Sequence, residues 1–414
     1  MLINQLLYIL SQELITTSQI FPAPYLNMLQ SVLISLGLGL GAGANLLVPE
    51  LTGPHKVGTT VLELVDSSRQ DPFAPTPQPR DLVISLFYPT SKHLKNCTLA
   101  PQFPPVTAAT IDALVNATGI AEAFTTRACA GSPLSRPDLP LVLFSPGLGN
   151  PRLFHSDIAE ELASYGWNVV TVDHPYESFI VEYPDGRSVS SDDSPNEANA
   201  TLEQYLDVRV KDMRFVLDSL SNSSVTSRIP GLETSRSAKT SSYNYPKTKF
   251  TTSKVGVFGH SFGGATSLQL LKDDPRFYVG ANLDGSVYGD VVQKGTDSPF
   301  VFFGNHDGAQ NHTDENDDTW AEAWKNLRGF KREYSVNGTL HGGYTDLPVF
   351  RDLLPSGALG DYAQGLGSIK GARILAIERA FLGALFDRFL KGKGGELLDG
   401  KGLNQWPEVT LVKK

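Results

Sequence analysis

The chain has 414 residues, of which 19% are charged and 41% are hydrophobic, and its formal net charge is −9. This is the composition of a globular protein with enough length for a large core, and its acidic balance argues against the basic face that nucleic-acid binding needs. Its two cysteines form no CxxC pair and join no Cys/His cluster, which argues against a structural zinc site.

The N-terminal 44 residues have the pattern of a leader. The stretch MLQSVLISLGLGLGAGANLL begins at Met28, with an apolar run over 32–40 and a small-residue site at 42–44. This order is typical of a signal peptide, and the run is too short and too glycine-rich for a spanning helix. We therefore expect translation to start at Met28, residues 1–44 to be an N-terminal extension with a signal peptide, and the protein to be secreted.

Two further features bear on secretion. Six Asn-x-Ser/Thr sequons exceed what the Ser/Thr content leads us to expect and indicate a glycoprotein; they begin at Asn96, Asn116, Asn199, Asn222, Asn311 and Asn337. In an oxidising compartment Cys97 and Cys129 would form a disulfide.

From about residue 80 the hydrophobic pattern alternates between strands and helices. In chain order the pattern predicts strand 82–89, strand 140–150, helix 155–166, strand 167–175, helix 202–220, strand 254–261, a helix from 264, strands 279–285 and 299–308, helix 318–330, strand 331–338 and helix 372–392. Continuous apolar strands between helices predict a mostly parallel sheet covered on both faces. Ligands bind at the carboxyl ends of strands in such sheets.

Domain organisation follows from the same pattern. We expect one domain over 45–414, interrupted by a Ser/Thr-rich, aperiodic segment at about 221–249 that reads as a mobile surface insertion. The apolar stripe of helix 372–392 is expected to pack on the sheet, with transient contact to a lipid surface as the alternative.

The sequence Gly259-His260-Ser261-Phe262-Gly263 fits the G-x-S-x-G pattern of a nucleophile elbow. A strand precedes it and a helix follows, so the turn would hold the serine hydroxyl above the sheet edge in a strained conformation. We predict that Ser261 is a nucleophile; the alternative is a simple glycine-rich turn.

Three histidines follow Ser261, as the chain order of this kind of triad requires. His306 and His312 lie in the polar stretch GNHDGAQNHTDENDD, which we expect to be solvated. His341 follows the last predicted strand and precedes two glycines that let its loop approach the serine. We predict that His341 is the base.

The acid that orients this base stays open. Asp284 and Asp307 each end a predicted strand and precede a glycine, so either could orient an imidazole. Asp346 comes after His341 in the chain and is expected to cap a loop.

An oxyanion site needs two N–H donors. One is expected from Phe262, the residue after the nucleophile. The other is expected from Leu148, in the loop FSPGLGN, where Gly147 and Gly149 let the backbone turn inward. A tight strand exit is the alternative reading of that loop.

Together these residues resemble the platelet-activating factor acetylhydrolases, the secreted plasma-type phospholipases of the α/β-hydrolase class. The matching pieces are DPFAP…RDLVISLFYPT (71–90), LVLFSPGLGNPRLFHSDIAEELASYGWNVVTVDHPYES (141–178), VGVFGHSFGGATS (255–267), ANLDGS (281–286) and GTLHGG (338–343). The resemblance implies an α/β-hydrolase fold and a calcium-independent serine esterase, without metal or cofactor, that removes a short sn-2 acyl group from a glycerophospholipid. It also implies Asp284 as the acid, whereas related polyester hydrolases and cutinases place the acid where Asp307 stands.

Other functions stay open from the sequence. A cutinase-like, polyesterase-like or general lipase activity would use the same residues, and a hydrolase fold without catalysis would be a binding protein. The expected partner is a phospholipid or another small ester, and no nucleic acid.

Overall fold

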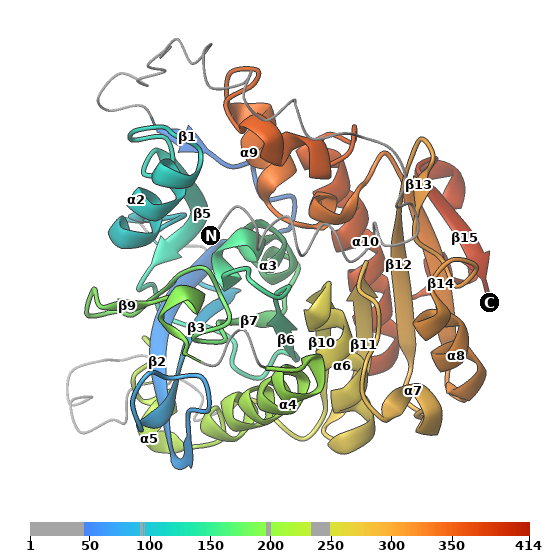
Figure 1. Cartoon of the computed structure of the whole chain (residues 1–414), viewed down its shortest axis with the longest axis horizontal. Coiled ribbons are helices and arrows are strands. Elements are labelled where there is room, and N and C mark those ends of the chain that lie inside the picture. The colour runs from blue at the N-terminus through green and yellow to red at the C-terminus, as the bar shows by residue number, and fades with distance from the viewer. Residues whose placement is uncertain (1–44, 92–93, 95, 196–199, 233–248) are drawn as a thin grey trace. The chain divides into compact units, whose positions relative to one another are not determined.

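A mixed sheet of 13 strands runs through the part of the chain that the structure describes (Figure 1). The structure is a computed structural model, and it describes residues 45–414 apart from 92–93, 95, 196–199 and 233–248. The expected signal peptide and most of the expected insertion lie outside the described residues.

The middle of the sheet is parallel. Its strands read across the sheet as β7 (Asn168–Val172), β6 (Leu141–Ser145), β10 (Val255–His260), β11 (Phe277–Leu283), β12 (Phe300–Asp307) and β14 (Lys331–Asn337). Apart from the ends of β11, β12 and β14 these strands are buried, as expected of parallel strands that helices cover on both faces. The predicted strands of this region are confirmed, with ends that differ by a few residues.

Both margins of the sheet contain antiparallel pairs, which the hydrophobic pattern did not predict. On one side lie β3 (Pro79–Pro89), β2 (Val57–Gln70), β5 (Phe124–Ala130), β4 (Leu99–Pro101) and β1 (Leu46–Leu47); on the other lie β15 (Val409–Lys413) and β13 (Gln310–Asn311). β2 alternates buried and exposed residues because it has one solvated face. A short hairpin of β8 (Val181–Glu182) and β9 (Ser188–Val189) stands apart from the sheet.

Helices cover both faces of the sheet, each over its own apolar core (Figure 1). One core contains residues of α4 (Leu202–Ser219), α6 (Phe262–Asp273), α7 (Val291–Lys294) and α8 (Asp318–Asn326). The other contains residues of α3 (Ser156–Ser164) and α10 (Gly371–Leu390). This doubly covered, mostly parallel sheet is the α/β-hydrolase fold.

The long C-terminal helix packs as predicted. Ile374, Ile377, Phe381 and Leu385 of α10 are buried in one of the two cores of the sheet, and Phe389 packs against this core while partly buried. Within the described residues, no helix has both the length and the apolar character needed to cross a membrane.

A smaller apolar core lies beside the sheet. It joins residues of α2 (Pro105–Leu114), β5, the turn 152–155 and α9 (Leu347–Leu353).

The segment expected as a mobile insertion is packed in its first part. Residues 221–232 include α5 (Ser223–Thr226), Ile229 is fully buried, and the Leu134 N–H donates to the Pro230 carbonyl at 2.7 Å. Most of these residues are exposed or half-buried, and Ile229, with the partly buried Leu232, anchors the segment on the core.

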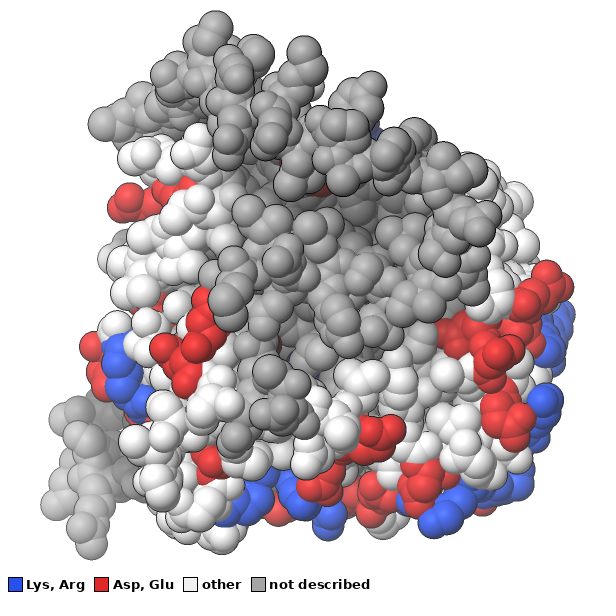
Figure 2. Space-filling view, viewed as in Figure 1, with Lys and Arg blue, Asp and Glu red and all other residues white. Residues whose placement is uncertain are grey.

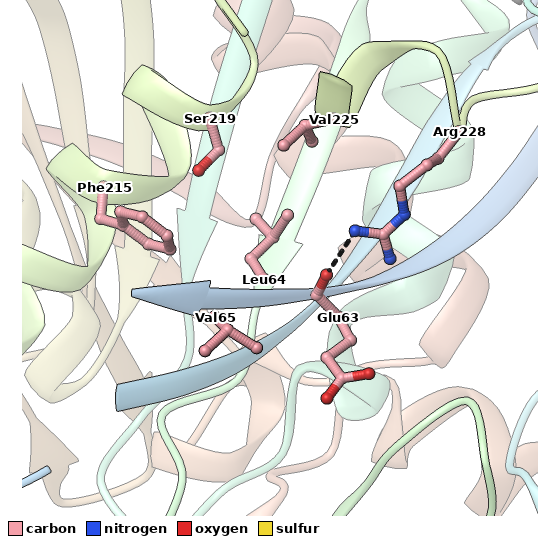
Figure 3. Close-up of a pocket in the computed structure, with 7 residues that line it drawn as sticks. All are labelled: Glu63, Leu64, Val65, Phe215, Ser219, Val225 and Arg228. Atoms are coloured by element: carbon pink, nitrogen blue, oxygen red, sulfur yellow. Dashed lines mark hydrogen bonds between the residues drawn. The ribbon is translucent and has the colours of Figure 1, made fainter. Parts of the chain in front are cut away.

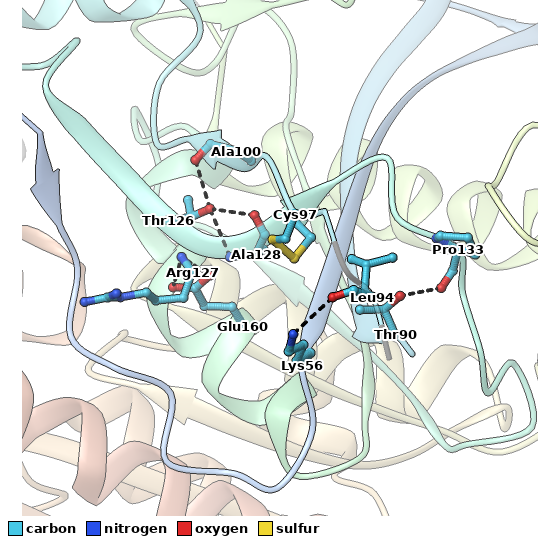
Figure 4. Close-up of a disulfide and its surroundings, with 11 residues drawn as sticks. Lys56, Thr90, Leu94, Cys97, Ala100, Thr126, Arg127, Ala128, Pro133 and Glu160 are labelled. Atoms are coloured by element: carbon cyan, nitrogen blue, oxygen red, sulfur yellow. Dashed lines mark hydrogen bonds between the residues drawn. A yellow bond between two sulfur atoms is a disulfide. The ribbon is translucent and has the colours of Figure 1, made fainter. Parts of the chain in front are cut away.

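Cys97 and Cys129 form a disulfide (Figure 4). Cys129 lies on β5, and the bond ties the loop after β3 to this strand. The same loop is held by Lys56, whose Nζ donates to the Leu94 carbonyl at 3.3 Å. The disulfide therefore fastens a long connection to the margin of the sheet.

Two surface features are separate from the strand ends where the site is expected. A pocket of about 330 Å³ lies between β2 and the end of α4, where Arg228 donates to the Glu63 carbonyl at 2.9 Å (Figure 3); its lining contains none of the expected site residues. On the face in Figure 2 the described Lys and Arg side chains lie next to Asp and Glu side chains. Lys272 forms ion pairs with both Asp273 and Asp290.

Candidate active site

Ser261 stands on the turn between β10 and α6, in the conformation expected of a nucleophile elbow. Its backbone has φ 54° and ψ −125°, a region that side chains rarely adopt. A Cβ at Gly259 would overlap the backbone of Gly263, and a Cβ at Gly263 would overlap the carbonyl of Ser145. The glycines are thus required by close approach of strand and helix, and the turn presents the Ser261 side chain at the carboxyl edge of the sheet.

Asp284 and His341 come together at the same edge. Asp284 directly follows β11, and His341 follows β14. His341 Nδ1 donates to Asp284 Oδ2 at 2.7 Å. Because a carboxylate only accepts, this bond keeps the proton on Nδ1 and directs the lone pair of a neutral ring to Nε2.

Asp284 is buried and held from several sides. Its backbone has φ 60°, and its N–H donates to the Phe303 carbonyl at 2.7 Å. Burial by itself would raise the pKa of Asp284, but hydrogen bonds from His312 and His341 outweigh it and hold the pKa well below the usual value. The group is therefore a carboxylate at neutral pH.

The other two acids have other partners. Asp307 is partly exposed and accepts the Ser368 N–H at 2.8 Å. Asp346 is buried and accepts the Ser156 N–H at 2.7 Å at the start of α3, so it caps a helix. Of the three candidates, Asp284 is the one that the structure places on His341.

The elbow and the His341 loop are joined through the residue before the nucleophile. His260 Nε2 donates to the His341 carbonyl at 2.9 Å, and the two rings lie 4.8 Å apart between centroids. Burial is the largest influence on His260 and lowers its pKa to about 3. This ring is therefore neutral, and it links the turn that holds Ser261 to the loop that holds His341.

The expected oxyanion donors lie beside Ser261. A Cβ at Gly147 would come within 3.2 Å of the Ser261 Cβ, so the loop after β6 passes directly over the serine. The Phe179 N–H donates to the Gly149 carbonyl at 2.9 Å and holds this loop. In the described part of the chain, the N–H groups of Leu148 and of Phe262, the first residue of α6, are not donors in the backbone hydrogen bonds of turns, loops and caps.

A buried arginine that the sequence analysis missed supports the same loop. Arg209 of α4 donates to the carbonyls of Pro146 at 2.5 Å and Gly147 at 3.3 Å, and to Glu177 at 2.7 Å. Its guanidinium lies 5.1 Å from the centre of the Phe262 ring. Arg209 therefore contacts both segments from which the oxyanion donors are expected, the loop after β6 and Phe262.

Arg209 belongs to a larger buried network of charged groups. Asp212, one helical turn later, accepts from Arg80 at 2.8 Å and from His174 Nδ1 at 3.0 Å. Arg209 and Asp212 lie three residues apart within the apolar stripe of the predicted helix 202–220. Charged residues on a buried stripe are rare unless they are paired, and this was the signal that could have found them.

His312 contradicts the expectation of a solvated loop. It is 7% exposed, its Nδ1 lies 3.0 Å from Asp284 Oδ1, and its ring stacks on Trp320 at 4.1 Å. The reason is the pairing of β13 with β12: the chain turns back after Asp307, and the His312 N–H donates to the Asn305 carbonyl at 3.0 Å. The ring is thereby placed against the Asp284 carboxylate.

His306, by contrast, is only partly buried. In the described part of the chain, no group of His, Cys, Asp and Glu side chains has the arrangement of a metal site.

Comparisons with known proteins agree with this geometry. The family model for platelet-activating factor acetylhydrolase, isoform II, matches residues 40–359. A probable 1-alkyl-2-acetylglycerophosphocholine esterase of Arthroderma benhamiae is 29% identical over 92% of this chain and 97% of its own. A platelet-activating factor acetylhydrolase of Cavia porcellus is 27% identical over 66% of this chain and 63% of its own.

Among solved structures, a ferulic acid esterase from Streptomyces cinnamoneus superposes with a TM-score of 0.74 and 30% sequence identity. The match covers 89% of this chain and 100% of that one.

Proposed function

Since the chain belongs to the platelet-activating factor acetylhydrolase, isoform II, family and is a carboxylic ester hydrolase, we propose that it cleaves the short sn-2 acyl ester of 1-alkyl-2-acetylglycerophosphocholine-like phospholipids with Ser261, Asp284 and His341. The observation that carries the site assignment is the 2.7 Å bond from His341 Nδ1 to Asp284 at the sheet edge where the strained Ser261 stands.

The first half-reaction forms an acyl-enzyme. His341 Nε2 takes the proton of the Ser261 hydroxyl while its oxygen attacks the ester carbonyl. The Leu148 and Phe262 N–H groups bind the resulting oxyanion; one such donor contributes about 3 kcal/mol. The intermediate collapses when His341 returns the proton to the departing sn-2 oxygen, and the acyl group stays on Ser261.

The second half-reaction reverses these roles. His341 takes a proton from a water molecule, whose oxygen attacks the acyl carbonyl, and the acid leaves as Ser261 regains its proton. Asp284 keeps the His341 tautomer fixed and stabilises the ring when it is positively charged.

A second candidate is an ester other than a phospholipid. The observation that favours it is the superposition on a ferulic acid esterase, whose 30% sequence identity to this chain is close to the 29% and 27% of the acetylhydrolase relatives. A cutinase-like, polyesterase-like or general lipase activity belongs to the same candidate.

A substrate panel separates these candidates. Purified protein is given a 2-acetyl phospholipid, the same phospholipid with a 2-palmitoyl chain, and methyl ferulate, with Ser261→Ala as control. The proposal expects the highest kcat/KM on the 2-acetyl phospholipid and none in the variant. Faster turnover of methyl ferulate would transfer the assignment to the second candidate.

We also propose that the protein is a secreted glycoprotein. In support, Cys97 and Cys129 form a disulfide, and every sequon asparagine in the described residues is exposed; these are Asn96, Asn116, Asn222, Asn311 and Asn337. N-terminal sequencing of protein from the medium of a eukaryotic host should find a start near residue 45. Protein retained in the cells, with no change of mass on glycosidase treatment, would contradict the proposal.

A further inference from the structure

The carboxylate of Asp284 carries a second imidazole besides that of His341. Its Oδ2 accepts from His341 Nδ1 at 2.7 Å and from Asn305 Nδ2 at 2.8 Å. Its Oδ1 accepts from the Asn305 N–H at 2.8 Å and lies 3.0 Å from His312 Nδ1. Four donors thus fix the carboxylate, and one of them is a histidine outside the triad.

His312 is enclosed between two carboxylates. Its Nδ1 faces Asp284, and its Nε2 lies 2.8 Å from Asp317 Oδ2. Since ionised carboxylates only accept hydrogen bonds, both ring nitrogens must donate, which requires the doubly protonated, cationic ring. Burial by itself would lower the pKa of His312, but the hydrogen bonds and charges of Asp284 and Asp317 outweigh it and raise the pKa to about 10.

Charged groups of the neighbouring strands also face this cluster. Glu333 of β14 is fully buried, and burial raises its pKa to about 7, with His312 among the charges that oppose the rise. Glu333 accepts the Asp314 N–H at 3.0 Å, and the Asp314 carboxylate pairs with Lys413 of β15. His312 thus contacts Asp284 directly at 3.0 Å, whereas Lys413 is engaged by Asp314.

Asp317 anchors the cluster to a helix. Its Oδ1 accepts the Thr319 N–H at 2.7 Å at the start of α8, and its Oδ2 also accepts the hydroxyl of Ser286 at 2.6 Å. Ser286 is two residues beyond Asp284. The Asp284 carboxylate is thus linked through His312 to Asp317 at the start of α8. The loop that follows Asp284 is linked to Asp317 as well, through the hydroxyl of Ser286.

We propose that His312, held as a cation between Asp284 and Asp317, is a positioning residue that fixes the Asp284 carboxylate and lowers the basicity of His341. The inference rests on the proposed role of Asp284 as the partner of His341. Its physical reason is that a positive charge on Oδ1 of the carboxylate offsets part of the negative charge that His341 experiences at Oδ2. The enzyme would then keep His341 neutral, and able to accept a proton, at lower pH.

The test is the pH dependence of kcat/KM, which reports the ionisation of His341 in the free enzyme. Two variants remove the charge in different ways. His312→Gln removes the ring, whereas Asp317→Asn keeps the ring and its bond to Asp284 but removes the carboxylate that holds its second proton. Asn also retains the cap of α8. His306→Gln is the matched control, because His306 lies nearby on β12 and its side chain is bonded to neither carboxylate.

His312→Gln and Asp317→Asn should each shift the acid limb of the kcat/KM profile to higher pH by about one unit. The reason is the loss of one positive charge close to Asp284, in a site that solvent screens only in part. In His312→Gln, kcat should also fall about tenfold with KM little changed, because the carboxylate loses a fixed donor. Asp317→Asn should keep more of kcat, and His306→Gln should match the wild type.

A folded Asp317→Asn whose acid limb coincides with that of the wild type overturns the inference, and it decides the matter even when His312→Gln does not fold. Asp284→Asn separates this failure from failure of the proposed site. If Asp284→Asn keeps the wild-type rate, the assignment of the acid is wrong and the inference falls with it. If it is inactive while both charge variants match the wild type, only the inference about His312 is overturned.

Discussion

Arg209 gives the sharpest test of how the oxyanion site is held. The change Arg209→Met keeps much of the side-chain volume but removes the donors to the carbonyls of Pro146 and Gly147 and the ion pair with Glu177. Arg209 and Glu177 are both almost completely buried.

The expected change in the free energy of unfolding depends on Glu177, which loses its ion-pair partner. Removing one member of a buried ion pair costs about 3–5 kcal/mol, because the other charge remains unpaired. Arg80 lies 3.8 Å from the other carboxylate oxygen of Glu177, and Glu177 already has a pKa that burial raises to about 7. Both features reduce the loss of stability, because Glu177 keeps one neighbouring cation and can become neutral by binding a proton. We therefore expect Arg209→Met to lower the free energy of unfolding by about 3 kcal/mol.

The double variant Arg209→Met/Glu177→Gln separates the effect of the unpaired Glu177 charge from the effect of the lost hydrogen bonds to the loop after β6. It removes the unpaired carboxylate, so the free energy of unfolding should return to within about 1 kcal/mol of the wild type. The carbonyls of Pro146 and Gly147 still lack their donor, so the Leu148 N–H is no longer fixed. We expect kcat to stay about 10²-fold low, as for loss of one oxyanion donor.

The assays are urea unfolding, followed by tryptophan fluorescence, and kcat on a soluble acetyl ester. Arg214→Met is the matched control on the same helix, since Arg214 is about half exposed and its ion pair with Asp274 spans 3.4 Å; exposed pairs contribute well under about 1 kcal/mol. A double variant that regained both stability and the wild-type kcat would refute the reasoning, because Arg209 would then be only a charge partner for Glu177.

Three further predictions follow from other parts of the molecule. Gly147→Ala should lower kcat on an acetyl ester with little change in melting temperature, since its methyl group would press on Ser261; unchanged kcat would mean that the loop can shift. Replacing Cys97 and Cys129 by Ala should lower the free energy of unfolding by about 4 kcal/mol in urea, from the entropy of a loop with sequence separation 32; a loss near zero would contradict the loop-entropy argument. Burial raises the pKa of Asp346 to about 7, above its unfolded value of about 4, so its contribution to stability is present in acid and is lost as pH rises through 7. Asp346→Asn should flatten that slope in urea unfolding between pH 5 and pH 8, and an unchanged slope would assign it to other groups.

The parallel middle of the sheet and the glycine-walled turn at Ser261 could both be predicted from local patterns of residues. Strands such as 141–145 and 255–260 are continuous apolar runs, and a run of this kind forms a buried strand wherever helices cover both faces. The turn at Ser261 could be recognised from a local pattern, because it needs glycines at 259 and 263. Five consecutive residues are therefore enough to indicate its geometry.

The surroundings of that serine depend on contacts between elements that lie far apart in the chain. Asp284 and Asp307 are alike in sequence, each at a strand end before a glycine, and what separates them is a contact to His341 that spans 57 positions of the chain. His312 reads as a loop residue, yet the return of β13 along β12 buries it against Asp284. Arg209 meets the oxyanion loop across more than 60 residues. Such pairings depend on how separate elements pack, and no local pattern of side chains encodes them.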